Sequence, residues 1–136
     1  MDAWTEIGAI NGYDAPAIEV LPAEAGKFAS LRGGCYGQQP CTEFTHYEWN
    51  GQKYDRTWID FKGHAVDVVP GGLMTITQDA AVRDAPHAKR GQVLDEYPVG
   101  TAMIVIGTAR DAPWSFVSPC SSCRRGFIET ALLQKQ

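Results

Sequence analysis

The sequence has no long apolar run and no surplus of positive charge. The longest apolar stretch is Met103–Ile106 with its flanks, far short of the ~20 residues that cross a membrane. Twelve lysines and arginines stand against sixteen acidic residues, which gives a formal net charge of −4. General nucleic-acid binding usually needs a basic face. We therefore expect neither a membrane span nor a nucleic-acid partner.

Motifs of catalysis and metal binding are also missing from the chain. His46, His64 and His87 are scattered, without H-E-x-x-H or H-x-H spacing. There is no G-x-S-x-G, no phosphate loop and no dinucleotide fingerprint. A cysteine nucleophile would be unpaired, whereas all four cysteines come in close pairs. We expect no enzyme activity, no cofactor and no bound metal.

Turn-forming residues are abundant, and they favour a mainly β fold. Fourteen glycines and eight prolines separate short apolar runs, and no segment shows a long helical period. The only helices expected are short pieces at Trp4–Ile10 and Glu129–Gln134. Residues 1–70 carry five basic and ten acidic side chains, whereas residues 71–136 carry seven and six. The acidity is therefore concentrated in the first half.

The four cysteines form two local pairs, Cys35 with Cys41 and Cys120 with Cys123. An even count in close pairs is typical of an oxidising compartment. We expect disulfides Cys35–Cys41 and Cys120–Cys123, because both loops close without tertiary help. Free thiols, a zinc site and a thioredoxin-like redox motif are the less favoured alternatives. This interpretation places the protein in the periplasm or outside the cell, with a signal peptide already removed.

The clearest local signal in the first half is Asn50-Gly51, between the β-rich runs Glu43–Trp49 and Gln52–Asp60. Asn-Gly at such a position predicts a two-residue hairpin turn. Further short strands are expected at Ala17–Leu21 and Gly26–Leu31.

Aromatic side chains of this hairpin are expected to alternate and to share one face. They are Tyr47, Trp49, Tyr54 and Trp58, whereas Phe44, His46 and Glu48 fall on the other face. The aromatic face is either a platform that stacks a sugar or a peptide, or a core face packed on the second half of the chain, and the core interpretation is favoured.

Pro70-Gly71-Gly72 is the most plausible boundary between a β-rich part, 1–70, and a second part, 71–136, packed against it. Five short strands with tight turns are expected after it, a pattern typical of a small barrel. They are Leu73–Thr77, Gln92–Tyr97, Thr101–Ile106, Trp114–Val117 and Arg125–Glu129. The positions expected to point inward are Val82, Val93, Ile104, Ile106, Val117 and Ile128.

Several motifs follow one another in this second part. They are Ala81-Val82-Arg83-Asp84-Ala85-Pro86, Gly100-Thr101 before Met103–Ile106, Trp114-Ser115-Phe116-Val117, Gly126-Phe127-Ile128 and the terminal Leu132-Leu133. In this order, residues 73–133 resemble the bacterial Src-homology-3-like (SH3-like) domain. Ala81 stands where the family usually has Asn, Phe127 where it has Trp, and the 118–125 loop carries a C-x-x-C insertion. The resemblance implies a five-stranded SH3-like barrel.

The resemblance also implies a peptide-binding groove lined by aromatic side chains between loops. Its candidate residues here are Tyr97, Trp114 and Phe116, with Asp84, His87 and Arg110 on adjoining loops. Trp114 either lines this groove or seals one end of the barrel, and we expect a mixed position with one edge buried.

These features predict an exported, non-catalytic binding protein that recognises a cell-wall peptide or glycan. One alternative is a periplasmic protein–protein module, such as an inhibitor or immunity protein of a secreted cell-wall enzyme. Another is an accessory part of a larger cell-wall hydrolase.

Overall fold

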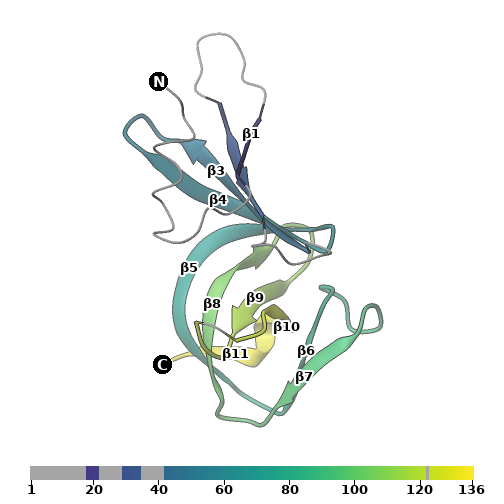
Figure 1. The fold of residues 1–136 in the computed structure, drawn as a ribbon. Helices are drawn as coiled ribbons and strands as arrows, with labels where there is room; N and C mark the ends of the chain where they lie inside the picture. Colours follow the sequence, from purple (N-terminus) through teal and green to yellow (C-terminus); the bar gives the residue numbers. More distant parts are fainter. Residues whose placement is uncertain (1–17, 22–28, 35–41, 122) are drawn as a thin grey trace. The chain divides into compact units, whose positions relative to one another are not determined.

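The computed structural model describes residues 18–21, 29–34, 42–121 and 123–136 (Figure 1). Nearly all regular structure in this part of the chain is β strand, which confirms the mainly β prediction. The chain divides into two compact units, residues 1–63 and 64–136, and each is described by itself. The helix predicted at Trp4–Ile10 lies outside the described residues.

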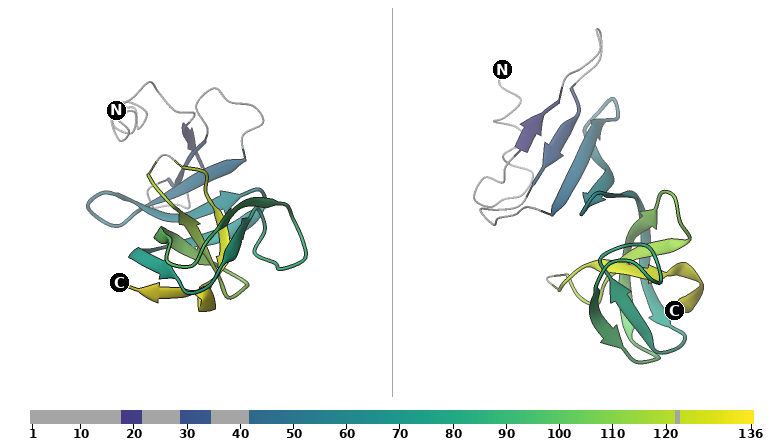
Figure 2. Two further views of the ribbon diagram at one scale, coloured as in Figure 1. Left: turned by 90° about the horizontal axis from the view of Figure 1, so that it is seen from below. Right: turned by 90° about the vertical axis from the view of Figure 1, so that its right-hand side faces the viewer.

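The described residues of the first unit form four antiparallel strands that neighbour one another in chain order (Figures 1 and 2). They are β1 (Ile18–Val20), β2 (Leu31–Gly33), β3 (Glu43–Trp49) and β4 (Tyr54–Phe61). The prediction for β1 is confirmed, whereas β2 begins at Leu31, where the predicted strand ends. Gly33, the last residue of β2, pairs with Ile18 and Thr45. Pairing on both sides outweighs the low strand preference of glycine.

The β3–β4 hairpin lies where Asn50-Gly51 predicts it, but its loop has four residues. Trp49 pairs with Tyr54, so the predicted two-residue turn and its register are wrong. The Asn50 side chain explains the longer loop, because its Oδ1 accepts the amides of Gln52 and Lys53 at 2.8 and 2.9 Å. These bonds satisfy main-chain donors that a two-residue turn would have satisfied within the ladder.

Seven antiparallel strands lie in the part of the second unit that the structure describes. They are β5 (His64–Ile76), β6 (Ala80–Arg83), β7 (Val93–Tyr97), β8 (Ala102–Ala109), β9 (Trp114–Ser118), β10 (Gly126–Glu129) and β11 (Leu133–Lys135). Their order in the sheet is β11-β5-β8-β9-β10-β6-β7. No pairing within the described residues joins β7 back to β11, so this sheet is not closed into a barrel.

Strand β5 runs through the boundary predicted at residues 70–72 and curves strongly (Figure 1). Its register against β8 shifts between Val68, which pairs with Gly107, and Gly72, which pairs with Val105. Proline has no amide to donate to a ladder, and Gly72 has a φ of +66°. Residues 70–72 are therefore a bulge within a strand, and the compact units meet at Gly63 instead.

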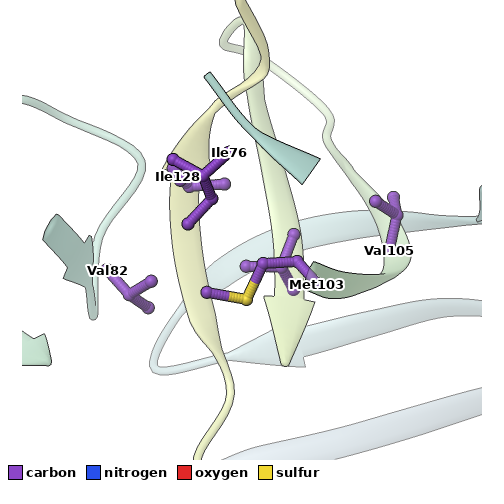
Figure 3. Close-up of a cluster of buried hydrophobic side chains, with 6 residues drawn as sticks. Ile76, Val82, Met103, Val105 and Ile128 are labelled. Atoms are coloured by element: carbon purple, nitrogen blue, oxygen red, sulfur yellow. The ribbon is translucent and has the colours of Figure 1, made fainter. Parts of the chain in front are cut away.

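A cluster of buried side chains forms the core of the second unit (Figure 3). It consists of Ile76, Val82, Met103, Val105, Val117 and Ile128. Its members come from β5 near one end of the sheet and from β6 near the other, so the curved sheet wraps around one core. The inward positions predicted on β6, β9 and β10 are confirmed.

The inward face predicted for β8 is wrong. Met103 and Val105 belong to the core, whereas Ile104 and Ile106 alternate with them and are only partly buried. Every residue of this run is apolar, so the sequence does not distinguish the two faces, and a one-residue error exchanges them. Val93 is also placed wrongly by the sequence, because its side chain is 44% exposed.

The helix predicted at Glu129–Gln134 is replaced by a 3₁₀ turn, Thr130–Leu132, followed by β11. Leu133 pairs with Ile76, and the Leu132 carbonyl accepts the Thr77 amide at 2.8 Å. Leu132 and Leu133 both pack against the core. Pairing with β5 satisfies this segment better than an isolated short helix, which is marginal in water.

Candidate binding site

The aromatic residues of the predicted groove do not lie together. Trp114 and Phe116 are 8% and 0% exposed, and both alternate along β9 with Val117, which belongs to the core cluster. They therefore face away from that cluster, whereas Tyr97 packs against it. The Phe116 ring contacts Phe127 instead, with centroids 5.2 Å apart. Trp114 is buried and does not occupy the mixed position that the sequence predicts.

Two of the polar residues predicted for the groove, Asp84 and His87, contact their own loop. Asp84 Oδ1 accepts the Gln92 amide at 2.7 Å, and His87 Nδ1 accepts the Lys89 amide at 2.9 Å. These two bonds order the loop between β6 and β7.

Arg110 pairs with Asp67 across β5 and β8. Its Nε and Nη2 lie 3.2 and 2.9 Å from Asp67 Oδ1. Both side chains are nearly half exposed, and such surface pairs contribute little to stability.

Tyr97 borders an open hollow of about 340 Å³ in the second unit. We call it the Tyr97 hollow; its lining is Asp79, Ala80, Ala81, Glu96, Tyr97 and Pro98. Ala80 pairs with Tyr97 and Ala81 with Glu96 across β6 and β7, so Tyr97 and Glu96 point to opposite faces of this strand pair and both border the hollow. Its volume is at the lower end for ligand pockets and suits one side chain or a small group.

The hollow is acidic in a unit with balanced charge. Residues 64–136 carry seven basic and seven acidic side chains, yet Asp79 and Glu96 both line the hollow. Asp79 Oδ1 accepts the Val99 amide at 2.8 Å, which fixes its carboxylate in place. The local field therefore favours a cationic group.

The Tyr97 hydroxyl keeps its proton at neutral pH. Partial burial raises the pKa of Tyr97 above its ordinary 10.0, the charge of Asp95 and a hydrogen bond to it add to the rise, and Arg124 opposes it. The hydroxyl therefore donates to Asp95. A neutral tyrosine ring beside carboxylates suits a cation, because the ring face attracts positive charge.

The second candidate surface, on β3 and β4, is divided between two faces. The register shifts between His46 and Tyr47, which pair with Trp58 and Arg56, so Thr57 is an extra residue and Trp58 points to the His46 face. Trp58 stacks on His46 with centroids 3.6 Å apart and an 8° interplanar angle. The predicted stripe of four aromatic side chains is therefore wrong.

Three aromatic side chains of this hairpin still share a face. Tyr47 and Tyr54 pack on Leu31, which is fully buried, and Trp49 meets Tyr54 edge to face at 5.1 Å. Two of the three thus contribute to a small core within the first unit, whereas packing of this face on the second half of the chain stays a prediction.

The disulfide Cys120–Cys123 is confirmed and lies between β9 and β10. The Ser118 hydroxyl donates to the carbonyls of Cys120 and Cys123. Cys35 and Cys41 lie outside the described residues, so the Cys35–Cys41 disulfide stays a prediction.

No family model, curated protein or solved structure matches the chain. Within the described residues, no group of three or more His, Cys, Asp or Glu side chains is arranged to hold a metal ion. The same part of the chain contains no helix with the length and apolarity needed to span a membrane.

Sequence reasoning found Tyr97 but missed the rest of the hollow. Asp79, Glu96 and Pro98 carry no motif, and Ala80 and Ala81 differ from ordinary strand residues only in size. The available signal was two consecutive small residues beside an aspartate. It gains meaning only once the register of β6 against β7 is known.

Proposed function

We propose that this protein is an exported, non-catalytic binding protein that recognises a cell-wall peptide at the Tyr97 hollow. The observation that carries this proposal is an open hollow bordered by one aromatic residue, Tyr97, and by two acidic residues, Asp79 and Glu96. In this proposal residues 73–133 are an SH3-like domain whose sheet is not closed into a barrel. The single core shared by β5, β6, β8, β9 and β10 supports that assignment.

The chemistry of the hollow favours a peptide over a glycan. Wall peptides carry a diamino acid whose side-chain amine is protonated at neutral pH, whereas an unsubstituted glycan offers hydroxyl groups and no cation. The amine would approach Asp79 and Glu96, and its aliphatic stem would pack on the Tyr97 ring. The disulfide Cys120–Cys123 is compatible with an exported protein.

Retention on purified peptidoglycan tests this proposal. We expect the protein to bind sedimented wall material and to be released by salt, because exposed charges are screened. Tyr97→Ala and Glu96→Gln should each weaken binding by about tenfold. Asp111→Asn is the matched control, because Asp111 is an exposed carboxylate between β8 and β9.

Two results would overturn the proposal. One is that Tyr97→Ala and Glu96→Gln both bind peptidoglycan as well as the wild-type protein does, which would show that the Tyr97 hollow is not the binding site. The other is a stoichiometric complex with a secreted cell-wall enzyme in the absence of any wall binding, which would favour the inhibitor alternative.

A further inference from the structure

We propose that the bound peptide pairs with β7 as an added strand and places one basic side chain in the Tyr97 hollow. This inference rests on the proposed function, because it specifies how a peptide occupies that hollow. The inference adds main-chain hydrogen bonds between the peptide and the edge strand β7. The proposed function requires only that one side chain of the peptide binds in the hollow.

Strand β7 is an edge of the sheet. Within the described residues it pairs with β6 alone, and an unpaired edge is a template for another strand. The pairing is regular where Val82, Ala81 and Ala80 meet Asp95, Glu96 and Tyr97. An antiparallel ladder uses alternate residues, so either Glu96 or both its neighbours turn their main-chain groups toward the open edge.

The accessible part of this edge is the end beside the hollow. Nearer the start of β7, the Leu94 carbonyl accepts Arg124 Nη1 at 3.3 Å, and the register against β6 shifts between Val82 and Arg83. An added strand therefore pairs along Asp95–Tyr97. Pro98 follows directly and ends the strand.

Charge selects the occupant of this edge. In a two-fold pair of β7 strands, Asp95 and Glu96 would meet the same carboxylates of a second copy, and like charges on paired strands are destabilising. A strand that carries lysine or arginine meets these carboxylates favourably. Val99, which is 59% exposed two residues after β7, offers apolar area next to this part of the edge.

The hollow fixes the register of the added strand. Successive side chains of a strand point to opposite faces, so a slip of one residue would move the basic side chain away from the Tyr97 hollow. Only one of the two alternate sets of peptide amides then faces β7. This asymmetry is specific to strand pairing and can be measured.

The test uses the full chain, labelled with ¹⁵N, and the probe acetyl-Val-Lys-Val-Lys-Val-amide. One version of the probe carries N-methyl groups on the second and fourth residues, and another carries them on the first, third and fifth. We expect one version to bind at least about tenfold more weakly than the parent and the other to stay within about threefold. Amide exchange should slow at Glu96, or at Asp95 and Tyr97, when the parent binds.

A second comparison tests whether the protein recognises the positive charge of the probe. The neutral probe acetyl-Val-Gln-Val-Gln-Val-amide should bind about tenfold more weakly than the lysine probe. Glu96→Gln should remove that preference, and Asp111→Asn should leave it unchanged.

Strand addition is overturned if the lysine probe does not bind, or if both methylated versions match the parent or weaken equally. Concentration-dependent self-association through β7 would overturn the charge argument. The peptidoglycan assay separates the two proposals. Retention that depends on Tyr97, together with no effect of N-methylation, would leave the proposed function standing and remove strand addition.

Discussion

Burial of Trp114 decides between the two roles predicted for it, a residue that lines a groove and a residue that packs in the interior. Its ring is 8% exposed on β9, so Trp114→Ala should leave a cavity and lower the free energy of unfolding by about 3–5 kcal/mol. Urea unfolding measures this loss, and Trp114→Phe, which keeps a ring, should lose less. A loss below about 1 kcal/mol would show that the ring is exposed in solution.

Gly126 is required by close packing and not by its backbone angles. A Cβ at this position would lie 2.5 Å from Val82 Cγ1 and 2.8 Å from the Arg83 carbonyl oxygen. Gly126→Ala should therefore destabilise the protein by about 1–3 kcal/mol. Gly33→Ala is the control, because its Cβ would meet Tyr47 at an ordinary 3.5 Å, and we expect a change within about 0.5 kcal/mol. Equal effects of the two substitutions would contradict the packing argument.

Tyr97 makes the stability of the protein depend on pH in the alkaline range. The pKa of its hydroxyl is raised by burial and by Asp95, so the folded protein releases this proton at higher pH than the unfolded chain. The stability that this shift contributes is fully present below pH 10.0, the ordinary pKa, and is lost as pH rises through the higher folded pKa.

Tyr97→Phe removes this titration. Compared with that variant, the wild-type protein should lose free energy of unfolding as pH is raised above 10.0, measured by urea unfolding at each pH. Parallel pH profiles of the free energy of unfolding for the two proteins would show that folding does not shift the pKa of the Tyr97 hydroxyl.

At the scale of elements, the Cys120–Cys123 loop holds the turn between β9 and β10. The closed loop is short, so the disulfide should contribute only about 2 kcal/mol. The double variant Cys120→Ser, Cys123→Ser should have a free energy of unfolding lower by that amount. A reductant should cause no further loss in this variant through the Cys120–Cys123 pair, because the bond is already absent. The unreduced wild-type protein should weigh four hydrogens less than the reduced one, two from this pair and two from Cys35–Cys41. A loss of only two would exclude the second disulfide.

The bulge in β5 has a consequence for the whole molecule. A fragment that starts at the predicted boundary, 72–136, lacks Val66, which is fully buried and pairs with Ala109. It also lacks Ala65, whose carbonyl accepts the Arg110 amide at 3.0 Å. Fragment 64–136 should therefore be more stable than fragment 72–136 by at least about 2 kcal/mol.

Thermal unfolding followed by circular dichroism compares the two fragments. We expect one cooperative transition for fragment 64–136 and a lower midpoint for fragment 72–136. Equal midpoints would show that residues 64–71 contribute nothing to the second unit.

The sequence by itself determined the features that depend on neighbours in the chain. Turn formers between short apolar runs gave the mainly β class, and Glu43–Trp49 is a strand with the predicted bounds. The Cys120–Cys123 disulfide formed as expected, because a loop this short closes without distant partners.

Tertiary structure alone decided the features that depend on register. Both faces of β8 are apolar, so only packing chose Met103 over Ile104 for the core. One extra residue, Thr57, places Trp58 on the His46 face. No local sequence pattern predicts this bulge. The Tyr97 hollow forms only because pairing of β6 with β7 brings Ala80 and Ala81 next to Tyr97 and Glu96. Strand pairing joins residues that are separated in the chain, and for this reason the site is a property of the fold and not of a motif.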